Sequence, residues 1–401
     1  MKNEVAVMVA MLLTAACTHS DGNAYFTDEQ IATVKVSEAS VAKVGTEGMQ
    51  VVDCNKIVES EYYYFSSMLD TMFFVTLDDS KQESLVGQIK ELVVNDSLIY
   101  IMDNTNAYNV VVFGRDGRFV NRMKIGQGPG EITYLLDLDV DPSNGDLLLY
   151  QNRGLSRYTS GGLQYKGSQT VPLGFDQFMV TDRGYVFYQI LSVINDHLGV
   201  HKDKSILVTD KDFKLQESAV DMFNVPLGKQ NKCLFRMGEE LRVVVPFNDT
   251  VYGIGDYGVR SVCQVEFRNK KIPTKELFES KIPAKTISES EDKYAFMGDY
   301  LETPTHQKIA LYNRHPVTIY VDKTTGNATG APVRLFNPTI APDVPEPIWG
   351  SGDYFISVCP PTFKDLDLVK PGVMSAEDIA KLKLLKEDSN PVLCFFKLKH
   401  F

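Results

Sequence analysis

The chain of 401 residues has six cysteines, one tryptophan and six histidines. No two cysteines form a CxxC pair, which disfavours a zinc or redox site built from them. The net charge of −11 disfavours nucleic acid as a partner, because an acidic surface is repelled by phosphates. The same charge disfavours electrostatic attachment to an anionic membrane. We recognise no set of nucleophile, base and metal ligands, so the sequence indicates an architecture more clearly than a reaction.

The chain does contain a regular alternation of short apolar runs and polar turns, which is clearest in residues 98–132. Residues 98–102 and 109–113 are rich in β-branched and aromatic side chains and have the usual length of a strand. Asp116 and Gly117 form a turn signal between the second run and a third strand at 119–125, because glycine accepts a positive φ. The glycine-rich residues 126–130 then end this unit and lead to the next sheet.

Similar units recur about every 40 to 50 residues, which is within the range of propeller repeats. The sequence therefore predicts an all-β fold, a six-bladed β-propeller over residues 71–401. An array of β-sandwiches is the alternative, but sandwich domains end near about 100 residues, and no linker divides this region. A ring of blades must leave no sheet edge open. Residues 70–77 and 390–399 each form a strand without an obvious neighbour, so we predict that they pair and close the ring.

The first residues predict that the protein is located in the cell envelope. Lys2 precedes the apolar run 5–13, which is too short to span a bilayer and ends in small residues before Cys17. This pattern resembles a bacterial lipoprotein signal peptide, which implies cleavage before Cys17 and lipidation of that cysteine. An ordinary cleaved signal with an incidental cysteine is the alternative. The predicted layout is a signal peptide at 1–16, a tether and N-terminal extension at 17–70, and the propeller. The protein would then be lipid-anchored, facing the periplasm or exposed on the outer membrane.

Several motifs in order resemble the six-bladed β-propeller lipoproteins of the bacterial envelope, a family without an established common function and distantly similar to NHL-repeat proteins. They are D-N-x-N at 103–106, G-x-G-P-G-E-I at 126–132, residues 246–252, and residues 389–393 with 397–399. The family tends to place a helix before the last strand. In this chain Ser375 and Asp378 predict the start of a helix over 376–386. Its apolar face, with Ile379, Leu382 and Leu385, is expected to pack on the rim of the propeller.

Three further motifs have ordinary structural explanations. His197 and His201 have the i, i+4 spacing of a helical metal site, but no third ligand is nearby, so we predict a solvated loop. Asn248-Asp249-Thr250 matches a glycosylation sequon, but its position between two strands favours a turn. Residues 126–130 lack the Lys-Ser/Thr of a phosphate loop and are predicted to cross between blades. The five cysteines other than Cys17 are predicted to be small buried core residues.

In a propeller, the loops between second and third strands and the crossings between blades meet on one face, which we call the loop face. We predict ligand contacts there from Asp103, Asn104, Asn106, Gln127, Glu131, Arg153, Arg314, His315 and Trp349. Trp349 can stack on a sugar or pack in the core of an inner strand. Arg153, Arg314 and His315 can bind a carboxylate, or remain solvated or in rim salt bridges.

These observations leave two function classes. The favoured one is a non-catalytic envelope protein, anchored through Cys17, that binds a glycan, a peptide or a partner protein and needs no metal or cofactor. The alternative is a metal-dependent hydrolase or lyase of the lactonase type, with Asp103, Asn104, Glu131 and Asp176 around a divalent ion. The metal content of the purified protein would separate them.

Overall fold

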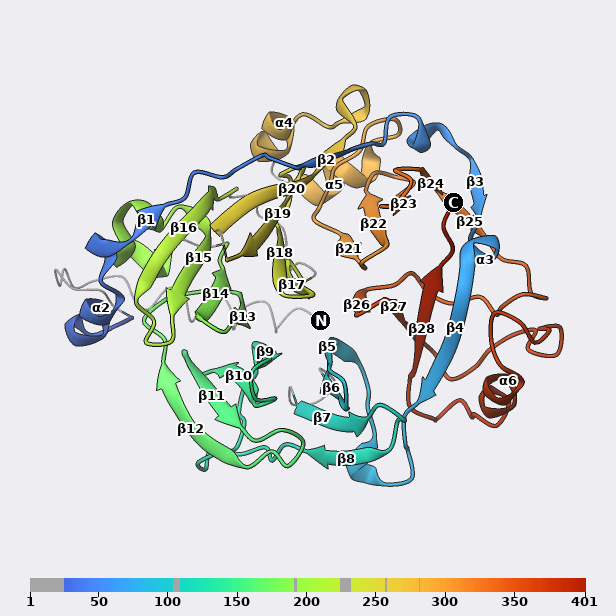
Figure 1. Cartoon of the computed structure of the whole chain (residues 1–401), viewed down its shortest axis with the longest axis horizontal. Coiled ribbons are helices and arrows are strands. Elements are labelled where there is room, and N and C mark those ends of the chain that lie inside the picture. Colours follow the sequence, from blue (N-terminus) through green and yellow to red (C-terminus); the bar gives the residue numbers. More distant parts are fainter. Residues whose placement is uncertain (1–24, 104–108, 191–192, 224–231, 257, 281) are drawn as a thin grey trace.

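The chain folds into a ring of six sheets around a central axis, and this confirms the predicted six-bladed β-propeller (Figure 1). The computed structural model describes residues 25–103, 109–190, 193–223, 232–256, 258–280 and 282–401. The predicted signal peptide and Cys17 lie outside these residues.

Each blade has four antiparallel strands, which follow one another from the centre of the ring outward. Blade 1 contains β5 (Ile89–Val94), β6 (Leu98–Asp103), β7 (Asn109–Gly114) and β8 (Phe119–Arg122), and blade 2 contains β9 (Asp137–Val140), β10 (Leu147–Gln151), β11 (Gly154–Tyr158) and β12 (Tyr165–Thr170). Blade 3 contains β13 (Gln177–Val180), β14 (Gly184–Tyr188), β15 (Lys204–Asp210) and β16 (Leu215–Asp221), and blade 4 contains β17 (Leu234–Met237), β18 (Glu240–Val244), β19 (Thr250–Gly255) and β20 (Gly258–Glu266). Blade 5 contains β21 (Tyr300–Glu302), β22 (His306–Leu311), β23 (Val317–Asp322) and β24 (Ala328–Ala331), and blade 6 contains β26 (Trp349–Ser351), β27 (Tyr354–Cys359), β28 (Val392–Leu398) and β4 (Leu69–Thr76).

The unit predicted at 98–132 is confirmed for three strands, but it lacks the first strand of its blade, β5. The charged residues Lys90 and Glu91 interrupt the apolar pattern of β5 and hide it in the sequence. Glu91 is nevertheless buried, because it points into the ring and meets a cation there. The third predicted strand ends at Arg122, and residues 123–136 cross to blade 2.

The two predicted closing strands pair with each other. β28 lies antiparallel to β4, with Val392 opposite Thr76 and Phe396 opposite Met72. In Figure 1 the red end of the chain therefore lies against a blue strand, which forms the outer edge of blade 6. Because β28 also pairs with β27, the first and last parts of the propeller share one sheet.

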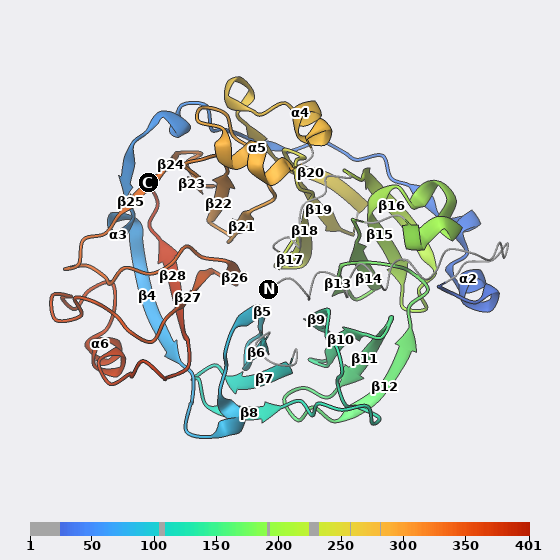
Figure 2. The same ribbon diagram turned by 180° about the vertical axis from the view of Figure 1, so that it is seen from behind.

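The N-terminal segment runs around the outside of the ring before it enters blade 6 (Figure 2). β1 (Ser40–Val41) adds a parallel strand to β16, and β2 (Gln50–Asp53) adds one to β20. β3 (Tyr62–Tyr64) pairs with β25 (Val333–Leu335). The segment thus covers the outer edges of blades 3 and 4. Its helical parts are α2 (Asp28–Val34), η1 (Val36–Glu38), η2 (Ile57–Glu59) and α3 (Phe65–Met68).

Six apolar layers join neighbouring blades, and the rings of Tyr320 and Phe355 meet in the layer between blades 5 and 6. As predicted, the five cysteines other than Cys17 are buried, and none of these five forms a disulfide bond. The predicted rim helix is α6 (Ala376–Leu382), whose N-cap Ser375 accepts a hydrogen bond from the N–H of Asp378. The remaining helices are η3 (Gln82–Ser84), η4 (Val193–His201), η5 (Arg268–Lys270), α4 (Thr274–Glu279) and α5 (Pro283–Glu289). Within the described ranges, every helix is too short or too polar to cross a membrane.

Candidate functional site

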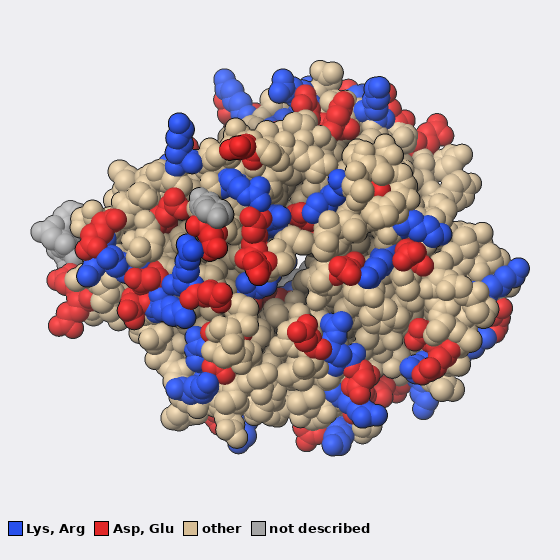
Figure 3. Space-filling model, viewed as in Figure 1, with Lys and Arg blue, Asp and Glu red and all other residues tan. Residues whose placement is uncertain are grey.

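The ring encloses a central cavity of about 790 Å³. The inner strands of all six blades line it, together with turns such as 95–97 and 352–353 that follow the first strands. These turns lie at the end of the ring opposite the loop face, and we call that end the turn face. Figure 3 shows a hollow near the centre of the ring with acidic and basic side chains around it. The cavity therefore belongs to the half of the channel nearer the turn face.

A lysine crosses the channel beside this cavity. Lys232, just before β17, contacts the carboxylate of Glu91 on β5, and its Nζ lies 3.3 Å from Oδ1 of Asp137 on β9. Both carboxylates are buried, and ion pairs in such a place are strong only when well hydrogen-bonded. Asp137 meets this condition, since its Oδ2 accepts a hydrogen bond of 2.8 Å from the N–H of Phe178. Three blades are thus tied together by one cation.

A second ion pair, between Arg236 on β17 and the buried Asp139 on β9, lies next to the first. Arg236 lies 3.3 Å from Oδ2 of Asp139, and the same oxygen accepts a 2.8 Å hydrogen bond from the N–H of Val180. Burial raises the pKa of Asp139 to about 6, although Arg236 and the N–H of Val180 act in the opposite direction. The wall of the cavity therefore includes a carboxyl group that titrates near neutral pH.

Trp349 lines the central cavity from the inner strand β26. Its side chain is half-buried and also packs against the apolar layer between blades 6 and 1, which includes Ile356. The ring thus packs in the core, which was one of the two interpretations from the sequence, and its stacking on a sugar stays a prediction.

Gln127 and Glu131 line a second hollow, a groove of about 790 Å³ on blade 2. The loop 126–131 forms one wall, and the loop-face end of the blade with Gln151 and Asn152 forms another. The glycine-rich stretch is, as predicted, a crossing between blades. The structure therefore brings Gln127 and Glu131 together, but it separates them from Trp349.

The basic candidates do not share a site. Arg153 on blade 2 donates a 3.2 Å hydrogen bond to the carbonyl of Tyr25 and lies over that ring. Arg314 on blade 5, three blades away, forms an ion pair with Glu291. The backbone N–H of His315 donates to Oδ1 of Asn313. Of the alternatives predicted for Arg314, the structure thus shows the salt bridge on the rim.

The acidic residues that we predicted as ligands of a divalent ion form hydrogen bonds to different parts of the backbone. Asp103 accepts hydrogen bonds from the N–H groups of Gly87 and Gln88 and lies 3.8 Å from Arg122. Asp176 accepts one from the N–H of Ile190. The candidates Asn104 and Asn106 lie outside the described residues.

The prediction of a solvated loop for His197 and His201 is wrong. Both belong to η4, where Nε2 of His197 lies 2.9 Å from the carbonyl of Pro172. Nδ1 of His201 lies 2.8 Å from the hydroxyl of Ser218, and its side chain is buried. Burial lowers the pKa of both imidazoles. The burial of both histidines depends on partners that are distant in sequence, so the local pattern of residues did not predict it.

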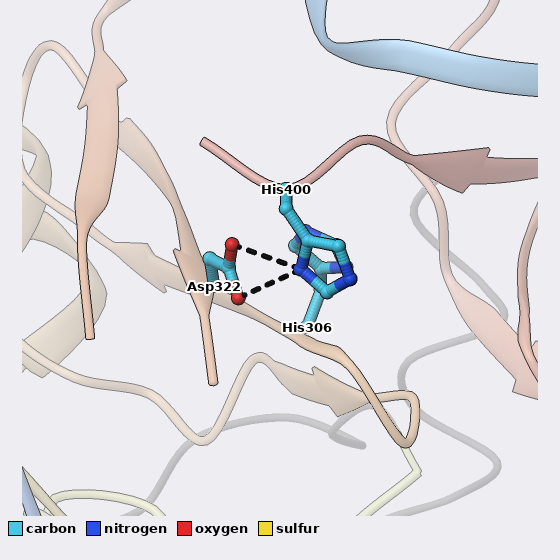
Figure 4. Close-up of side chains that lie close together, drawn as sticks. All are labelled: His306, Asp322 and His400. Atoms are coloured by element: carbon cyan, nitrogen blue, oxygen red, sulfur yellow. Dashed lines mark hydrogen bonds and ion pairs between the residues drawn. The ribbon is translucent and has the colours of Figure 1, made fainter. Parts of the chain in front are cut away.

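No sequence motif indicated the cluster formed by His306, Asp322 and His400 (Figure 4). Their ligand atoms lie within 4.8 Å of one another, and such groups can bind zinc. All three side chains already have protein partners, however. Asp322 accepts from the backbone N–H of Thr324 and Phe401 and lies 3.1 Å from Nδ1 of His400.

This cluster fixes the end of β28 onto blade 5. Nε2 of His306 lies 3.0 Å from the carbonyl of Lys399, which follows β28. Burial alone would raise the pKa of Asp322, but the N–H groups of Thr324 and Phe401 and the His400 ring lower it to about 2. A metal ion would have to displace several of these hydrogen bonds, so the geometry favours a structural contact.

A family model described as "Domain of unknown function (DUF4934)" matches residues 49–397. No curated protein matches the chain in sequence. Among solved structures, BF0058 of Bacteroides fragilis, which is named as a candidate exported protein, is 17% identical with a TM-score of 0.67. The match covers 88% of this chain and 100% of that one, and it shows a shared fold. BamB from Moraxella catarrhalis is more distant, with 8% identity over 71% of this chain and 75% of that one and a TM-score of 0.37.

Proposed function

The chain belongs to the DUF4934 family, whose function is unknown, and from this premise we propose that it is a lipid-anchored envelope protein that binds a ligand without catalysis. The observation that carries the proposal is the central cavity. Its volume of about 790 Å³ is in the range of small-ligand pockets, and all six blades contribute to its wall.

The wall combines features that recognise a ligand with both apolar and polar parts. Trp349 and Phe235 supply aromatic surface, while Arg236 and Asp139 supply charged groups that are held in place by the sheets. A glycan end or a peptide side chain has this mixed character. The net charge of −11 continues to disfavour nucleic acid.

The lipid anchor is supported by the first seventeen residues, which resemble a lipoprotein signal peptide, and by the name of BF0058 as a candidate exported protein. Eight residues lead from Cys17 to Tyr25, and an extended chain of that length spans at most about 28 Å. Tyr25 contacts Arg153 near the loop face. An anchor at Cys17 would therefore keep the loop face near the membrane and leave the mouth of the cavity on the turn face exposed.

The only tryptophan of the chain lies on the cavity wall, so its fluorescence reports on the cavity. Purified protein is titrated with muropeptides, neutral oligosaccharides and a hexapeptide library while Trp349 emission and binding heat are recorded. We expect a ligand that shifts the emission, and weaker binding in Trp349→Ala. Tyr62→Ala, which changes an exposed residue on β3, is the matched control and should bind normally.

The cavity as the site would be contradicted if none of the probes both shifts Trp349 emission and binds more weakly to Trp349→Ala. Stoichiometric metal together with turnover of a ligand would favour the hydrolase or lyase instead. For the anchor, cells are labelled with a fatty-acid analogue: the wild type should be labelled and Cys17→Ser should not, and an unlabelled wild type would refute lipidation.

A further inference from the structure

We propose that the groove on blade 2 is a separate binding site for a neutral glycan. This groove shares no residue with the lining of the central cavity, so ligand binding at the two sites can be tested independently. It lies between the loop 126–131 and the outer part of blade 2.

The chemistry of the lining favours a neutral ligand rich in hydroxyl groups. Amide and hydroxyl side chains predominate, and no lysine or arginine is among the residues that line the groove. Glu131 is the one charged residue there. A carboxylate surrounded by neutral donors and acceptors suits sugar hydroxyls, whereas it would repel an anionic ligand. The amides are those of Gln127, Gln151, Asn152 and Gln169.

Tyr165 supplies an aromatic surface for a sugar ring. Its side chain is 40% exposed at the start of the outer strand β12, and the ring of Tyr158 supports it at a centroid distance of 5.6 Å. Gly130 has φ of +80°, and a Cβ atom there would come within 2.6 Å of the Cβ of Tyr165. The glycine therefore lets the loop approach the tyrosine and form a narrow groove beside it.

Glu131 is held in a position to accept hydrogen bonds from a ligand. Its Oε2 accepts a 2.9 Å hydrogen bond from the N–H of Gly128, and the loop closes around the carboxylate. Its other oxygen accepts no hydrogen bond from the described residues. The backbone thus fixes one oxygen, and the second stays available to a hydroxyl donor.

Gln151 adds a buried polar group without a full set of partners. Its Nε2 donates to the hydroxyls of Ser156 and Tyr158, at 3.1 and 3.4 Å. Its Oε1 is buried and has no donor in the described structure. Buried polar atoms are nearly always paired. Rotation of this amide toward the groove would let Oε1 accept a hydrogen bond from a ligand hydroxyl.

The test uses maltotriose, cellotriose, chitotriose and mannotriose as probes, measured by calorimetry on the full mature chain. We expect at least one to bind, and Tyr165→Ala to weaken that binding by about tenfold through the lost stacking surface. Glu131→Gln should weaken it as well. Tyr165→Phe keeps the ring and should bind within about threefold of wild type, which would assign the affinity to the ring and not to the hydroxyl. A melt of Tyr165→Ala by circular dichroism checks that this variant is folded.

Two controls separate this site from the central cavity. Tyr62→Ala removes another exposed tyrosine and should leave glycan affinity unchanged. Trp349→Phe should also leave it unchanged, and glycan bound in the groove should not shift Trp349 emission. The proposal is overturned if none of the four sugars binds, if binding survives Tyr165→Ala and Glu131→Gln, or if a hexapeptide occupies the groove in their place.

Discussion

Lys232 and Glu91 come from opposite sides of the ring, yet the Nζ atom of the lysine contacts the carboxylate of the glutamate inside the channel. Lys232 precedes blade 4 and Glu91 lies on β5 of blade 1, so the pair spans the ring across its axis. Asp137 of blade 2 shares the same cation. The centre of this propeller is therefore held by charges as well as by the apolar layers between blades.

Removal of the lysine should be costly, because it leaves two buried carboxylates without a cation. Burial lowers the pKa of Lys232 to about 7, so the test is made at pH 6, where the ammonium group is charged. We expect Lys232→Met to lower the free energy of unfolding by about 3–5 kcal/mol, as measured by urea denaturation at that pH. Lys381→Met is the matched control, since Lys381 pairs with Glu377 on the surface of α6, where an ion pair contributes little to the free energy of unfolding. Equal stability of the two variants would show that the central pair contributes nothing.

The pKa of Asp139 predicts a pH dependence of stability. Folding raises this pKa from 3.8 to about 6, so between these values the unfolded state loses its proton before the folded state does. The contribution of Asp139 to stability is therefore full below pH 4 and is lost as the pH rises to about 6. Relative to Asp139→Asn, the wild type should lose about 3 kcal/mol over this range. Urea titrations at pH 4, 5, 6 and 7 measure the difference, and a constant value would contradict the shift.

Gly117 is required at the turn between β7 and β8. Its φ is +83°, and a Cβ atom there would overlap the carbonyl oxygen of Thr76 on β4. We expect Gly117→Ala to cost more than about 2 kcal/mol, because strain and overlap add. Gly48→Ala is the control, with φ of +71° and open space around it, and should cost about 1 kcal/mol. Thermal melts of both variants measure the costs, and a smaller loss for Gly117→Ala would be inconsistent with the close contact.

Closure of the ring predicts the effect of truncation. Deletion of residues 392–401 removes β28, which pairs with both β27 and β4, so we expect no cooperative unfolding transition in circular dichroism. Deletion of His400 and Phe401 alone keeps β28 and removes contacts to Asp322, Thr325, Asn327 and His306. This shorter deletion should melt cooperatively at a reduced temperature, because it loses these contacts but keeps the closing sheet. A cooperative melt of the longer deletion would rule out closure by β28.

Local patterns were sufficient to predict much of the fold. Short apolar runs and the Asp116-Gly117 turn are decided by neighbours in sequence, and the turn has the expected positive φ at Gly117. Strand β5 was missed because Lys90 and Glu91 have the composition of a surface segment. Glu91 is buried only because Lys232 lies opposite, 141 positions later in the chain.

The candidate site was predictable only in part. The sequence placed Gln127 and Glu131 on one face, and the groove contains both, but Trp349 lines a cavity nearer the opposite face. His201 was expected in solvent and is buried against Ser218. In each case the environment of the side chain depends on contacts between blades, which the local pattern of hydrophobicity does not encode.

The amino-acid sequence by itself determined most of the strands and their turns, the number of blades and the pairing of the two closing strands, because these follow from short-range periodicity and from the need to leave no sheet edge open. Only the tertiary structure decided which charges face the channel, which loops form the groove and where Trp349 lies. The reason is that packing six sheets around an axis brings together residues that are distant in sequence, and the free energy of burying their charges depends on the partner that each one meets there.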